Sequence, residues 1–222
     1  MSYDLVILTT ACSRSKLHNI SFEKIKNFLE GYKCKWIIRI DQIKDELPEI
    51  TSENFKKILS SDNIDLETYI SERTAGRISW FKTVKFCINE GYKYNPKIGY
   101  FWLEDDWIQN SGITLKELLN NNSLPESYFL SLANREGELN FNPSIWSPDL
   151  YKNYMYDKIN NAVMPDVGGN AERACTYIGD STGKNIKPEP CNNINMFTLN
   201  VFRDIGRDWA KNNISKERTF YY

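Results

Sequence analysis

The sequence predicts a single α/β domain spanning residues 1–222, with a mixed, mostly parallel central sheet flanked by helices. Three observations favour this fold class. The chain opens with the pattern strand, helix, strand, which forms parallel sheets with right-handed crossovers. Its length suits one large domain better than two small ones. No internal repeat and no linker rich in proline, glycine and serine divides it.

The first half has a regular pattern of apolar, β-branched runs and amphipathic runs. The expected strands cover residues 4–10, 36–41 and 98–103. The expected helices cover residues 21–31, 52–61 and 72–90, with Ser21 capping the first and Gly91 ending the third. His18 precedes the first of these helices and is interpreted as a surface residue.

The second half has a mixed pattern. Capping signals at Thr114-Leu-Lys-Glu117 and Ser147-Pro148 predict helices that reach Asn120 and about residue 161. Strands are expected at residues 128–132, 141–146 and 195–202. Two further helices are expected, one at residues 171–174 after a glycine turn and one at residues 207–211 capped by Asp204.

The balance of charges excludes several classes of function. The chain has 28 lysines and arginines against 29 aspartates and glutamates, a formal net charge of -1. Proteins that bind nucleic acid or anionic membranes in general carry a basic surface, so neither partner is expected. No apolar run approaches the ~18 residues of a membrane span, and no secretory signal is recognised, so the expected location is cytoplasmic.

Cysteine and histidine usage narrows the possible chemistry. The five cysteines are scattered, with no C-x-x-C pair, so neither a disulfide framework nor a structural zinc site is predicted. His18 is the one histidine, which excludes zinc sites that need two histidines. Unless His18 itself serves, it also excludes Ser-His and Cys-His nucleophile pairs. Any chemistry is therefore expected to use carboxylates.

Three acidic residues, Glu104, Asp105 and Asp106, follow the strand predicted at residues 98–103. Open α/β sheets bind ligands beyond the carboxyl ends of their strands. Adjacent carboxylates repel each other, and a hard divalent cation with bound phosphates removes that repulsion. The run therefore indicates a metal site, and the alternative is a solvated acidic turn.

An ordered set of segments resembles a known family. The set is Val6-Ile-Leu-Thr-Thr10 with Ser13-Arg-Ser-Lys-Leu17, Trp36-Ile-Ile-Arg-Ile-Asp41, and Phe101-Trp-Leu-Glu-Asp-Asp-Trp107. It resembles the nucleotide-sugar-binding half of a GT-A fold glycosyltransferase, especially the small stand-alone enzymes of large DNA viruses, with Glu104-Asp105-Asp106 as a variant of the DxD motif. The resemblance covers residues 4–110. It implies a Rossmann-like GT-A domain that transfers a sugar from a nucleotide diphosphate donor, with UDP expected first.

The resemblance implies roles for the strand ends. Strand one and its loop would contact the nucleoside through Thr9, Thr10 and Arg14. Asp41, at the end of the second strand, would accept a hydrogen bond from uracil or guanine.

The same resemblance implies roles for the acidic run. Asp106 would ligate Mn²⁺ or Mg²⁺ directly, Asp105 would lie near the ribose or the metal, and Glu104 would lie near the donor sugar. A cation that bridges Asp106 and the two phosphates would stabilise the departing diphosphate as a Lewis acid.

Arginines and a general base complete the expected site. Arg73 and Arg77 share a helix face and, with Arg14, would bind the diphosphate, although a solvated helix face is the alternative. An inverting transfer needs a base that takes the proton of the acceptor hydroxyl. Glu172 lies in the first turn of a predicted helix, where inverting GT-A enzymes place this base, and Asp166 is the second choice. A retaining enzyme needs no such base, so the stereochemistry stays open.

Residues 111–222 are expected to bind the glycan or glycoconjugate acceptor. Trp107 and Trp146 are candidates for stacking on a sugar, and the basic stretch from Arg203 onward is a candidate lid over the diphosphate. Two alternatives remain. A sugar nucleotidyltransferase also holds a metal on strand-end acids, but it needs a glycine-rich loop, and residues 11–18 contain no glycine. A non-catalytic carbohydrate-binding or virion structural module would bind sugar without metal.

Overall fold

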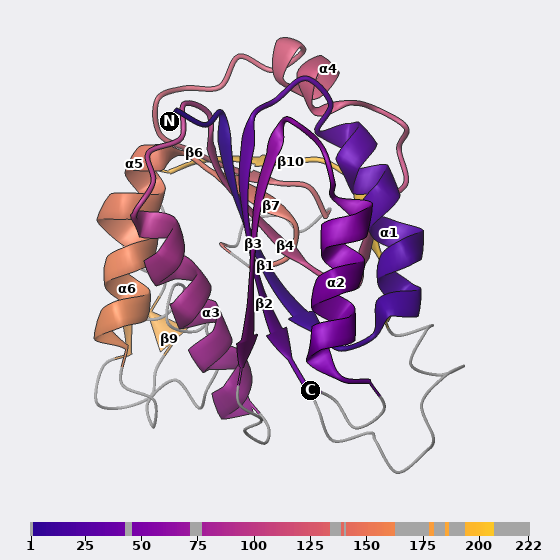
Figure 1. Ribbon diagram of the computed structural model, residues 1–222. Coiled ribbons are helices and arrows are strands. Elements are labelled where there is room, and N and C mark those ends of the chain that lie inside the picture. Colours follow the sequence, from indigo (N-terminus) through magenta and orange to yellow (C-terminus); the bar gives the residue numbers. More distant parts are fainter. Residues whose placement is uncertain are drawn as a thin grey trace.

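The computed structural model describes residues 2–42, 46–71, 77–133, 139, 141–162, 178–179, 185–186 and 194–206. A central sheet separates two layers of helices (Figure 1). Helices α1 (Ser15–Phe28) and α2 (Pro48–Ile58) cover one face. Helices α3 (Arg77–Tyr92) and α6 (Tyr156–Asn161) cover the other. This arrangement confirms the predicted α/β class.

The described part of the main sheet has seven strands in the order β10-β6-β7-β4-β1-β2-β3. Their bounds are β1 Leu5–Cys12, β2 Cys34–Asp41, β3 Ile64–Ser71, β4 Gly99–Glu104, β6 Tyr128–Ser131, β7 Ser144–Trp146 and β10 Asn195–Thr198. Strands β1 to β4 are parallel, whereas β7 is antiparallel to both of its neighbours. The sheet is therefore mixed and mostly parallel, as predicted.

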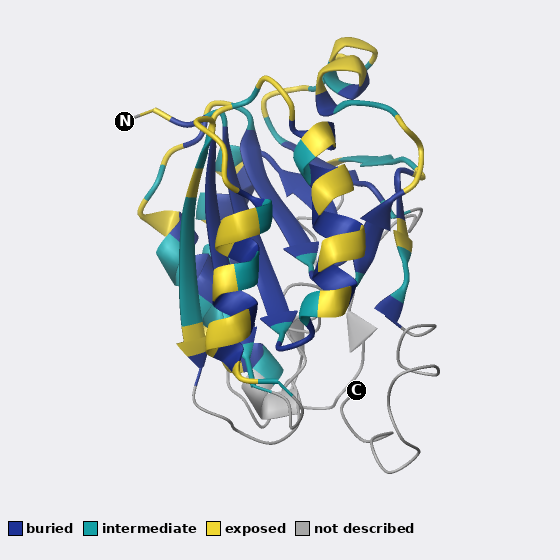
Figure 2. Cartoon of the chain, turned by 45° about the vertical axis from the view of Figure 1, so that its right-hand side comes forward, coloured by how far each residue is buried: buried dark blue, intermediate teal, exposed yellow. Residues whose placement is uncertain are grey.

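Strand β1 is buried on both faces, which explains its uninterrupted apolar sequence. Leu5 and Ile7 pack with α1 and α2, and Val6 and Leu8 pack with α3. Figure 2 shows the central strands of the sheet as buried, and the edge strand β3 and the outer faces of the helices as intermediate to exposed. The first strand therefore forms the centre of the fold and sets the position of the loop that follows it.

The remaining elements frame the sheet. Helix α4 (Leu115–Asn120) begins with the predicted capping box, in which Thr114 and Glu117 exchange hydrogen bonds. Helix α5 (Pro148–Leu150) continues through a π-helical turn η1 (Tyr151–Met155) into α6. Two short antiparallel pairs lie outside the main sheet: β5 (Trp107–Gln109) with β11 (Phe202–Asp204), and β8 (Ile178–Gly179) with β9 (Asn185–Ile186).

Several predicted boundaries are wrong, each for a physical reason. Helix α1 begins at Ser15 rather than at Ser21 because Glu46, distant in sequence, binds its first backbone N–H. Strand β3 was not expected, because its apolar residues alternate with acids instead of forming a run. Asp204 ends β11, and its Oδ1 accepts from the backbone N–H of Gly206 at 2.8 Å, the bond expected of a helix cap. The helices expected at residues 171–174 and 207–211 lie outside the described residues.

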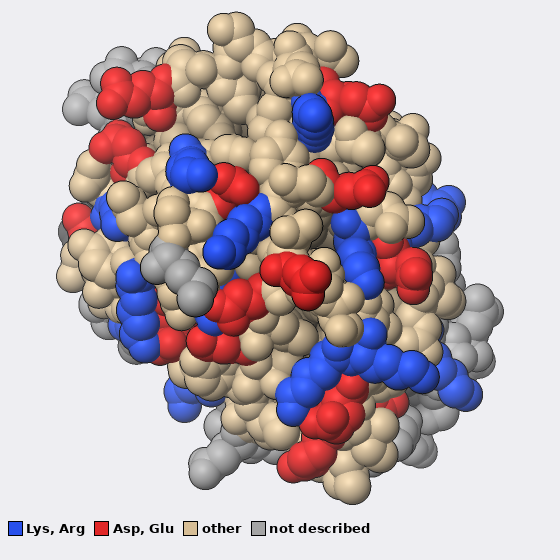
Figure 3. All heavy atoms as spheres, turned by 45° about the horizontal axis from the view of Figure 1, so that its top comes forward, with Lys and Arg blue, Asp and Glu red and all other residues tan. Residues whose placement is uncertain are grey.

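Two surface observations complete the fold. Among the described residues, no helix combines the length and apolar character needed to cross a membrane. On the face shown in Figure 3, acidic and basic side chains are interspersed, as the nearly equal counts of the two charges suggest.

Trp146 is fully buried in β7 against Phe129 and Phe141, so its expected role in stacking on a sugar is wrong.

Candidate active site

The carboxyl ends of β4, β1 and β2 lie side by side, because these strands are parallel neighbours in the sheet (Figure 1). In register, Thr10 lies opposite Glu104, and Cys12 lies opposite Asp41. The acidic run after β4 therefore adjoins the loop after β1. This is the edge at which open α/β sheets bind ligands.

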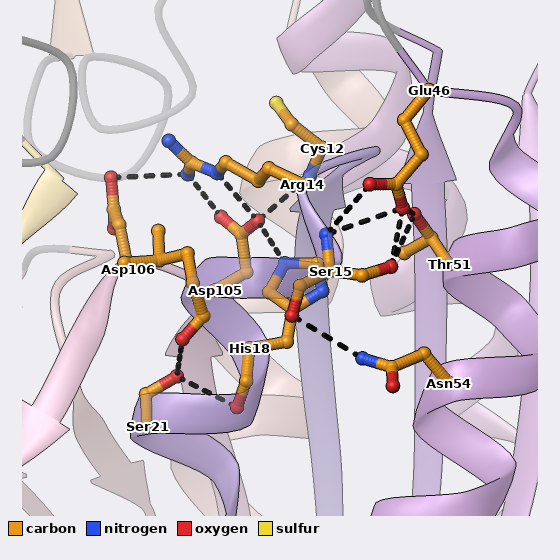
Figure 4. Close-up of polar contacts among 11 residues, drawn as sticks. Cys12, Arg14, Ser15, His18, Ser21, Glu46, Thr51, Asn54, Asp105 and Asp106 are labelled. Atoms are coloured by element: carbon orange, nitrogen blue, oxygen red, sulfur yellow. Dashed lines mark hydrogen bonds and ion pairs between the residues drawn. The ribbon is translucent and has the colours of Figure 1, made fainter. Parts of the chain in front are cut away.

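The carboxylate of Asp105 is enclosed at this edge, with 3% of the residue exposed. Oδ2 accepts from Arg14 Nε at 2.9 Å, from His18 Nε2 at 2.8 Å and from the Cys12 backbone N–H at 2.9 Å (Figure 4). Oδ1 accepts from Arg14 Nη2 at 2.5 Å. A carboxylate has about four acceptor positions, so these four bonds, three of them to Oδ2, leave Asp105 little spare acceptor capacity.

The protonation of Asp105 follows from these contacts. Burial acts to raise the pKa of its carboxyl group, but the charge of Arg14 and the hydrogen bonds from His18 and Arg14 outweigh burial and hold the pKa well below its usual range. Arg14 is itself buried, which acts to lower its pKa, but the adjacent Asp105 raises it further. Both groups are therefore charged at neutral pH and form a bidentate ion pair.

Arg14 links the two aspartates. Besides its two bonds to Asp105, Nη2 lies 3.3 Å from Oδ2 of Asp106 (Figure 4). The guanidinium joins the loop after β1 to the loop after β4, with 8% of the residue exposed. A positive charge with fixed orientation is thus presented at the ligand-binding edge of the sheet.

Asp106 has a different environment from Asp105. Burial, together with the negative charges of Asp105 and Asp204, outweighs the attraction of Arg14 and raises the pKa of Asp106 to about 6. Gly206 packs directly against the carboxylate, and a Cβ atom at this position would overlap it. The backbone N–H of Ile205 also donates to the Asp106 carbonyl at 2.8 Å. The segment after β11 therefore forms one wall around Asp106.

His18 was expected at the surface, and this expectation is wrong. The side chain is fully buried in α1, stacked on Phe55 at 4.4 Å between ring centroids and edge-on to Phe22 at 5.6 Å. Nε2 reaches Asp105, whereas Nδ1 is buried with no hydrogen-bond partner among the described residues. His18 precedes Phe22 by four residues and Ile25 by seven, a spacing that places all three on one face of a helix. This spacing is the signal in the sequence that puts His18 on the inner face of α1.

Glu46 is a second residue that the sequence analysis missed. Both carboxylate oxygens lie 3.2 Å from the backbone N–H of Ser15, the first residue of α1, and Thr51 Oγ1 donates to Oε1 at 2.5 Å (Figure 4). A negative charge at this position stabilises the helix N-terminus. Glu46 therefore anchors the start of α1, next to the loop that carries Arg14.

Asp41 ends β2 on the α3 face of the sheet. Ser71 Oγ donates to Oδ1, and Thr83 Oγ1 lies 2.9 Å from Oδ1 and 3.2 Å from Oδ2. Burial raises the pKa of Asp41, although the two hydroxyl bonds and the charge of Arg39 act to lower it. The carboxylate is held in one orientation at the strand end, as a residue that binds a ligand must be.

The other expected donor-site residues have contrasting positions. Thr9 is fully buried, and its hydroxyl accepts from the Trp36 indole N–H at 2.9 Å, so its side chain belongs to the core. Thr10 is 7% exposed on the opposite face. Glu104 is half-buried and accepts from the Trp107 indole N–H at 3.3 Å. The structure thus brings Thr10, Arg14 and the acidic run to one edge and points Thr9 away from it.

The predicted base and two of the arginines cannot be placed. Glu172, Asp166 and Arg73 lie outside the described residues, and Arg77 begins α3 with its side chain undescribed. Their roles stay predictions.

The fit of a divalent cation depends on Asp106. Within the described ranges, no group of three histidines, cysteines or acids is arranged to hold a metal. Asp105 has its acceptor positions occupied by protein donors, whereas Asp106 has one contact to Arg14 at 3.3 Å. Magnesium-like ions are often held by one or two carboxylates together with substrate phosphates. The residues therefore fit a cation that shares one carboxylate with a bound diphosphate, and they do not fit an all-protein cage.

Two solved structures are similar to this chain, and the first of them supports the fold. The chain is 11% identical to the mannosyltransferase PcManGT from Pyrobaculum calidifontis, solved in complex with GDP-Man and Mn²⁺, with a TM-score of 0.52 over 89% of this chain and 57% of that chain. It also matches a glycosyltransferase involved in glycosylation of the major capsid of PBCV-1, at 10% identity and a TM-score of 0.45, over 88% of this chain and 81% of that chain. No protein-family model and no curated protein matches the sequence.

The match to the mannosyltransferase establishes a shared fold. The chain spans just over half of the mannosyltransferase that it matches. The predicted Rossmann-like GT-A fold is confirmed, and activity has to be argued from the site itself.

Proposed function

We propose that this protein is a glycosyltransferase that transfers a hexosyl group from a nucleotide diphosphate, with UDP as the first candidate, to a hydroxyl group of a glycan or glycoconjugate. Residues 1–110 would bind the donor, and residues 111–222 would bind the acceptor and provide a lid from the C-terminal segment. The observation that carries the proposal is the guanidinium of Arg14, held between Asp105 and Asp106 at the ligand-binding edge of a GT-A sheet.

Arg14 is suited to a departing diphosphate. The leaving group gains negative charge as the glycosidic bond breaks, and a preorganised cation stabilises that charge without reorganisation. Asp105 holds Arg14 through two bonds on one side of the guanidinium, and Nη2 extends from there toward Asp106. In this proposal Asp105 and His18 are positioning residues, and Arg14 is the residue that contacts the phosphates.

Asp106 is the carboxylate that would hold a divalent cation, with Mn²⁺ or Mg²⁺ as the proposed ion. When bound, the cation would supply Lewis-acid stabilisation of the diphosphate. The Mn²⁺ in the mannosyltransferase complex supports this choice of ion. The alternative role of Asp105 as a metal ligand is less favoured, because its oxygens already accept four hydrogen bonds.

The transfer step needs one more group. The bond between the sugar C1 and the diphosphate oxygen breaks, its electron pair leaves with the diphosphate, and the acceptor oxygen forms the new bond to C1. In an inverting reaction a carboxylate takes the proton of the acceptor hydroxyl. Glu172, or else Asp166, is proposed for this role, and Arg73 and Arg77 are proposed as further phosphate contacts.

Thermal unfolding with nucleotides and Mn²⁺ tests the proposal. UDP or GDP with Mn²⁺ should raise the Tm, because a ligand at 100 times its Kd stabilises the folded state by about 2.7 kcal/mol. Asp106→Ala should abolish the part of the shift that depends on Mn²⁺. Asp62→Ala, which removes an exposed acid remote from the site, should retain it. Incubation with a nucleotide sugar and a glycan should then release free nucleotide diphosphate.

Other results would point to the alternatives. If no nucleoside diphosphate shifts the Tm, with or without Mn²⁺, the proposal fails. Glycan binding that is insensitive to EDTA and independent of nucleotide would indicate a carbohydrate-binding module. Consumption of a nucleoside triphosphate and a sugar phosphate, with release of pyrophosphate, would indicate a nucleotidyltransferase.

A further inference from the structure

Trp80, near the start of α3, is the one described tryptophan that is not buried. The other four described tryptophans are buried: Trp36, Trp102, Trp107 and Trp146. An indole that stays accessible presents a flat apolar face to whatever lies beside it. Neither the packing of the core nor the proposed transfer accounts for the partial exposure of Trp80.

The exposure of Trp80 does not come from a position on the outer face of the helix. Trp80 precedes Val84 by four residues and Ile88 by eight, and residues at this spacing share one face of a helix. Val84 and Ile88 are fully buried between α3 and the sheet. Trp80 therefore points in the same direction as these buried residues, and yet it is not covered.

The strands end beneath the first turns of α3. Thr83 Oγ1 donates to Oδ1 of Asp41, the last residue of β2, at 2.9 Å. Trp80 lies almost one turn closer to the start of the helix than Thr83. Because α3 begins at the carboxyl edge of the sheet and runs back along it (Figure 1), Trp80 lies beyond the strand ends. This is the edge that carries the acidic run after β4.

Phe141 holds the indole of Trp80 on the β4 side of this edge. The two ring centroids are 6.3 Å apart and the rings are nearly perpendicular. Phe141 is buried and lies 4.7 Å from Trp102 of β4, again between ring centroids. Ser144 of β7 pairs with Trp102, so the residues before Ser144 run past the end of β4. Trp80 is therefore positioned by a rigid neighbour next to the acidic run.

Resting on the proposed function, we propose that Trp80 stacks on the pyranose ring of a bound sugar beside the diphosphate. One face of a pyranose presents weakly positive C–H groups, and the face of an indole is negative. Strand β4 lies on the opposite side of β1 from β2, where the nucleobase is expected, so the sugar is the part of the substrates that fits this position. The pyranose is either the transferred group of the donor or a ring of the acceptor.

Calorimetric titration in the presence of Mn²⁺ tests the inference with two matched pairs of ligands, UDP with UDP-glucose and GDP with GDP-mannose. If Trp80 stacks on the transferred sugar, Trp80→Ala should weaken the nucleotide sugar about fivefold and leave the nucleoside diphosphate unchanged. If Trp80 stacks on the acceptor, both should bind unchanged. The protein saturated with nucleoside diphosphate should then bind methyl glycosides of glucose, galactose or mannose about fivefold more weakly.

Further variants separate stacking from packing. Trp80→Phe keeps an aromatic face and should lose less affinity for the sugar than Trp80→Ala. Trp80→Leu fills much of the space without an aromatic face and should lose as much, and it replaces Trp80→Ala if circular dichroism shows that the alanine variant does not fold. Tyr92→Ala is the control, because Tyr92 is an exposed aromatic residue at the other end of α3. Its affinities should equal those of the wild type.

Two results would overturn the inference and leave the proposed function intact. One is that Trp80→Ala weakens the nucleoside diphosphate and its nucleotide sugar equally, which would place the contact on the nucleotide. The other is that Trp80→Ala changes no affinity. Absence of binding of any nucleotide to the wild type would instead overturn the proposed function, and this inference with it.

Discussion

His18 donates from Nε2 to Oδ2 of Asp105 over 2.8 Å, and the two residues are 87 positions apart in the sequence. The bond joins the inner face of α1 to the loop after β4. Asp105 also accepts from Arg14, so His18 and Arg14 share one carboxylate. His18 therefore helps to fix the position of the guanidinium at the edge of the sheet. Four predictions follow from this cluster and its neighbours.

Two substitutions of His18 should distinguish the contribution of its hydrogen bond to stability from the contribution of its packing. His18→Phe fills the space of the imidazole ring but leaves Asp105 without one donor. We expect a loss of about 2 kcal/mol in the free energy of unfolding. His18→Gln can place an N–H near the position of Nε2 and should lose less, by about 1 kcal/mol. Urea unfolding measures both values. Equal losses would mean that the hydrogen bond contributes nothing.

Asp105→Asn should destabilise the fold although it conserves the shape of the side chain. The amide can accept fewer of the four hydrogen bonds, and it leaves Arg14 buried without its main counter-ion. Breaking a buried ion pair costs about 3–5 kcal/mol. The matched control, Asp62→Asn, changes an exposed acid and should stay within about 0.5 kcal/mol of the wild type in the same unfolding experiment. Similar values for the two variants would contradict the role of Asp105.

Asp106 should make stability depend on pH in the absence of metal. Its pKa is raised to about 6 in the folded state, above the usual value of about 3.9 in the unfolded chain. The folded state therefore binds more protons between these values, and the stability falls as the pH rises through this window. Asp106→Asn removes the titration, so it should be more stable than the wild type by about 1–3 kcal/mol at pH 8 and lose this advantage at pH 4.

Urea unfolding in EDTA at the two pH values checks this prediction. The lowered pKa of Asp105 has the opposite effect on stability. Its ionised carboxylate stabilises the folded state above about pH 4, and this contribution to the free energy of unfolding is lost as the pH falls further. Asp106→Asn retains Asp105, so both proteins should lose stability in strong acid. An advantage of Asp106→Asn that is the same at pH 4 and pH 8 would contradict the raised pKa of Asp106.

Gly206→Ala should disturb Asp106 from the other side of the site. The new Cβ atom would overlap the Asp106 carboxylate, so that either the carboxylate or the segment after β11 has to move. We expect a loss of stability of about 1–3 kcal/mol and a smaller Tm shift with Mn²⁺ and UDP.

Gly31→Ala is the control for this substitution. Gly31 has a φ of 86° and no atom near the position of a Cβ, so alanine strains the backbone there without touching the site. It should lower the Tm while leaving the shift caused by the ligands unchanged. The opposite result, a ligand shift reduced equally in both variants, would remove the specific role of Gly206.

Much of the fold could be predicted because its signals are local. The apolar run of β1 and the capping box at Thr114 each depend on neighbours in the sequence, and both were found. Strand β3 was missed because its stability depends on a distant partner. Lys35 of β2, buried in the sheet, forms ion pairs with Asp65 at 3.0 Å and with Glu67 at 2.6 Å, and these allow an acidic edge strand to pair. The start of α1 was missed for the same reason, since its cap is Glu46.

The sequence by itself determined the α/β class, the existence of strands β1, β2 and β4, and the placement of an acidic run at a strand end. These features follow from hydrophobic periodicity and from the rule that parallel strands end at a common edge. Only the tertiary structure decided how the two aspartates differ. Asp105 accepts hydrogen bonds from Arg14, His18 and the Cys12 backbone and stays ionised. Asp106 has a longer contact to Arg14, packs against Gly206 and lies near two other acids, and it resists ionisation. Adjacent residues of the same type acquired opposite properties because burial and partner charge, which act through space, set the pKa of each.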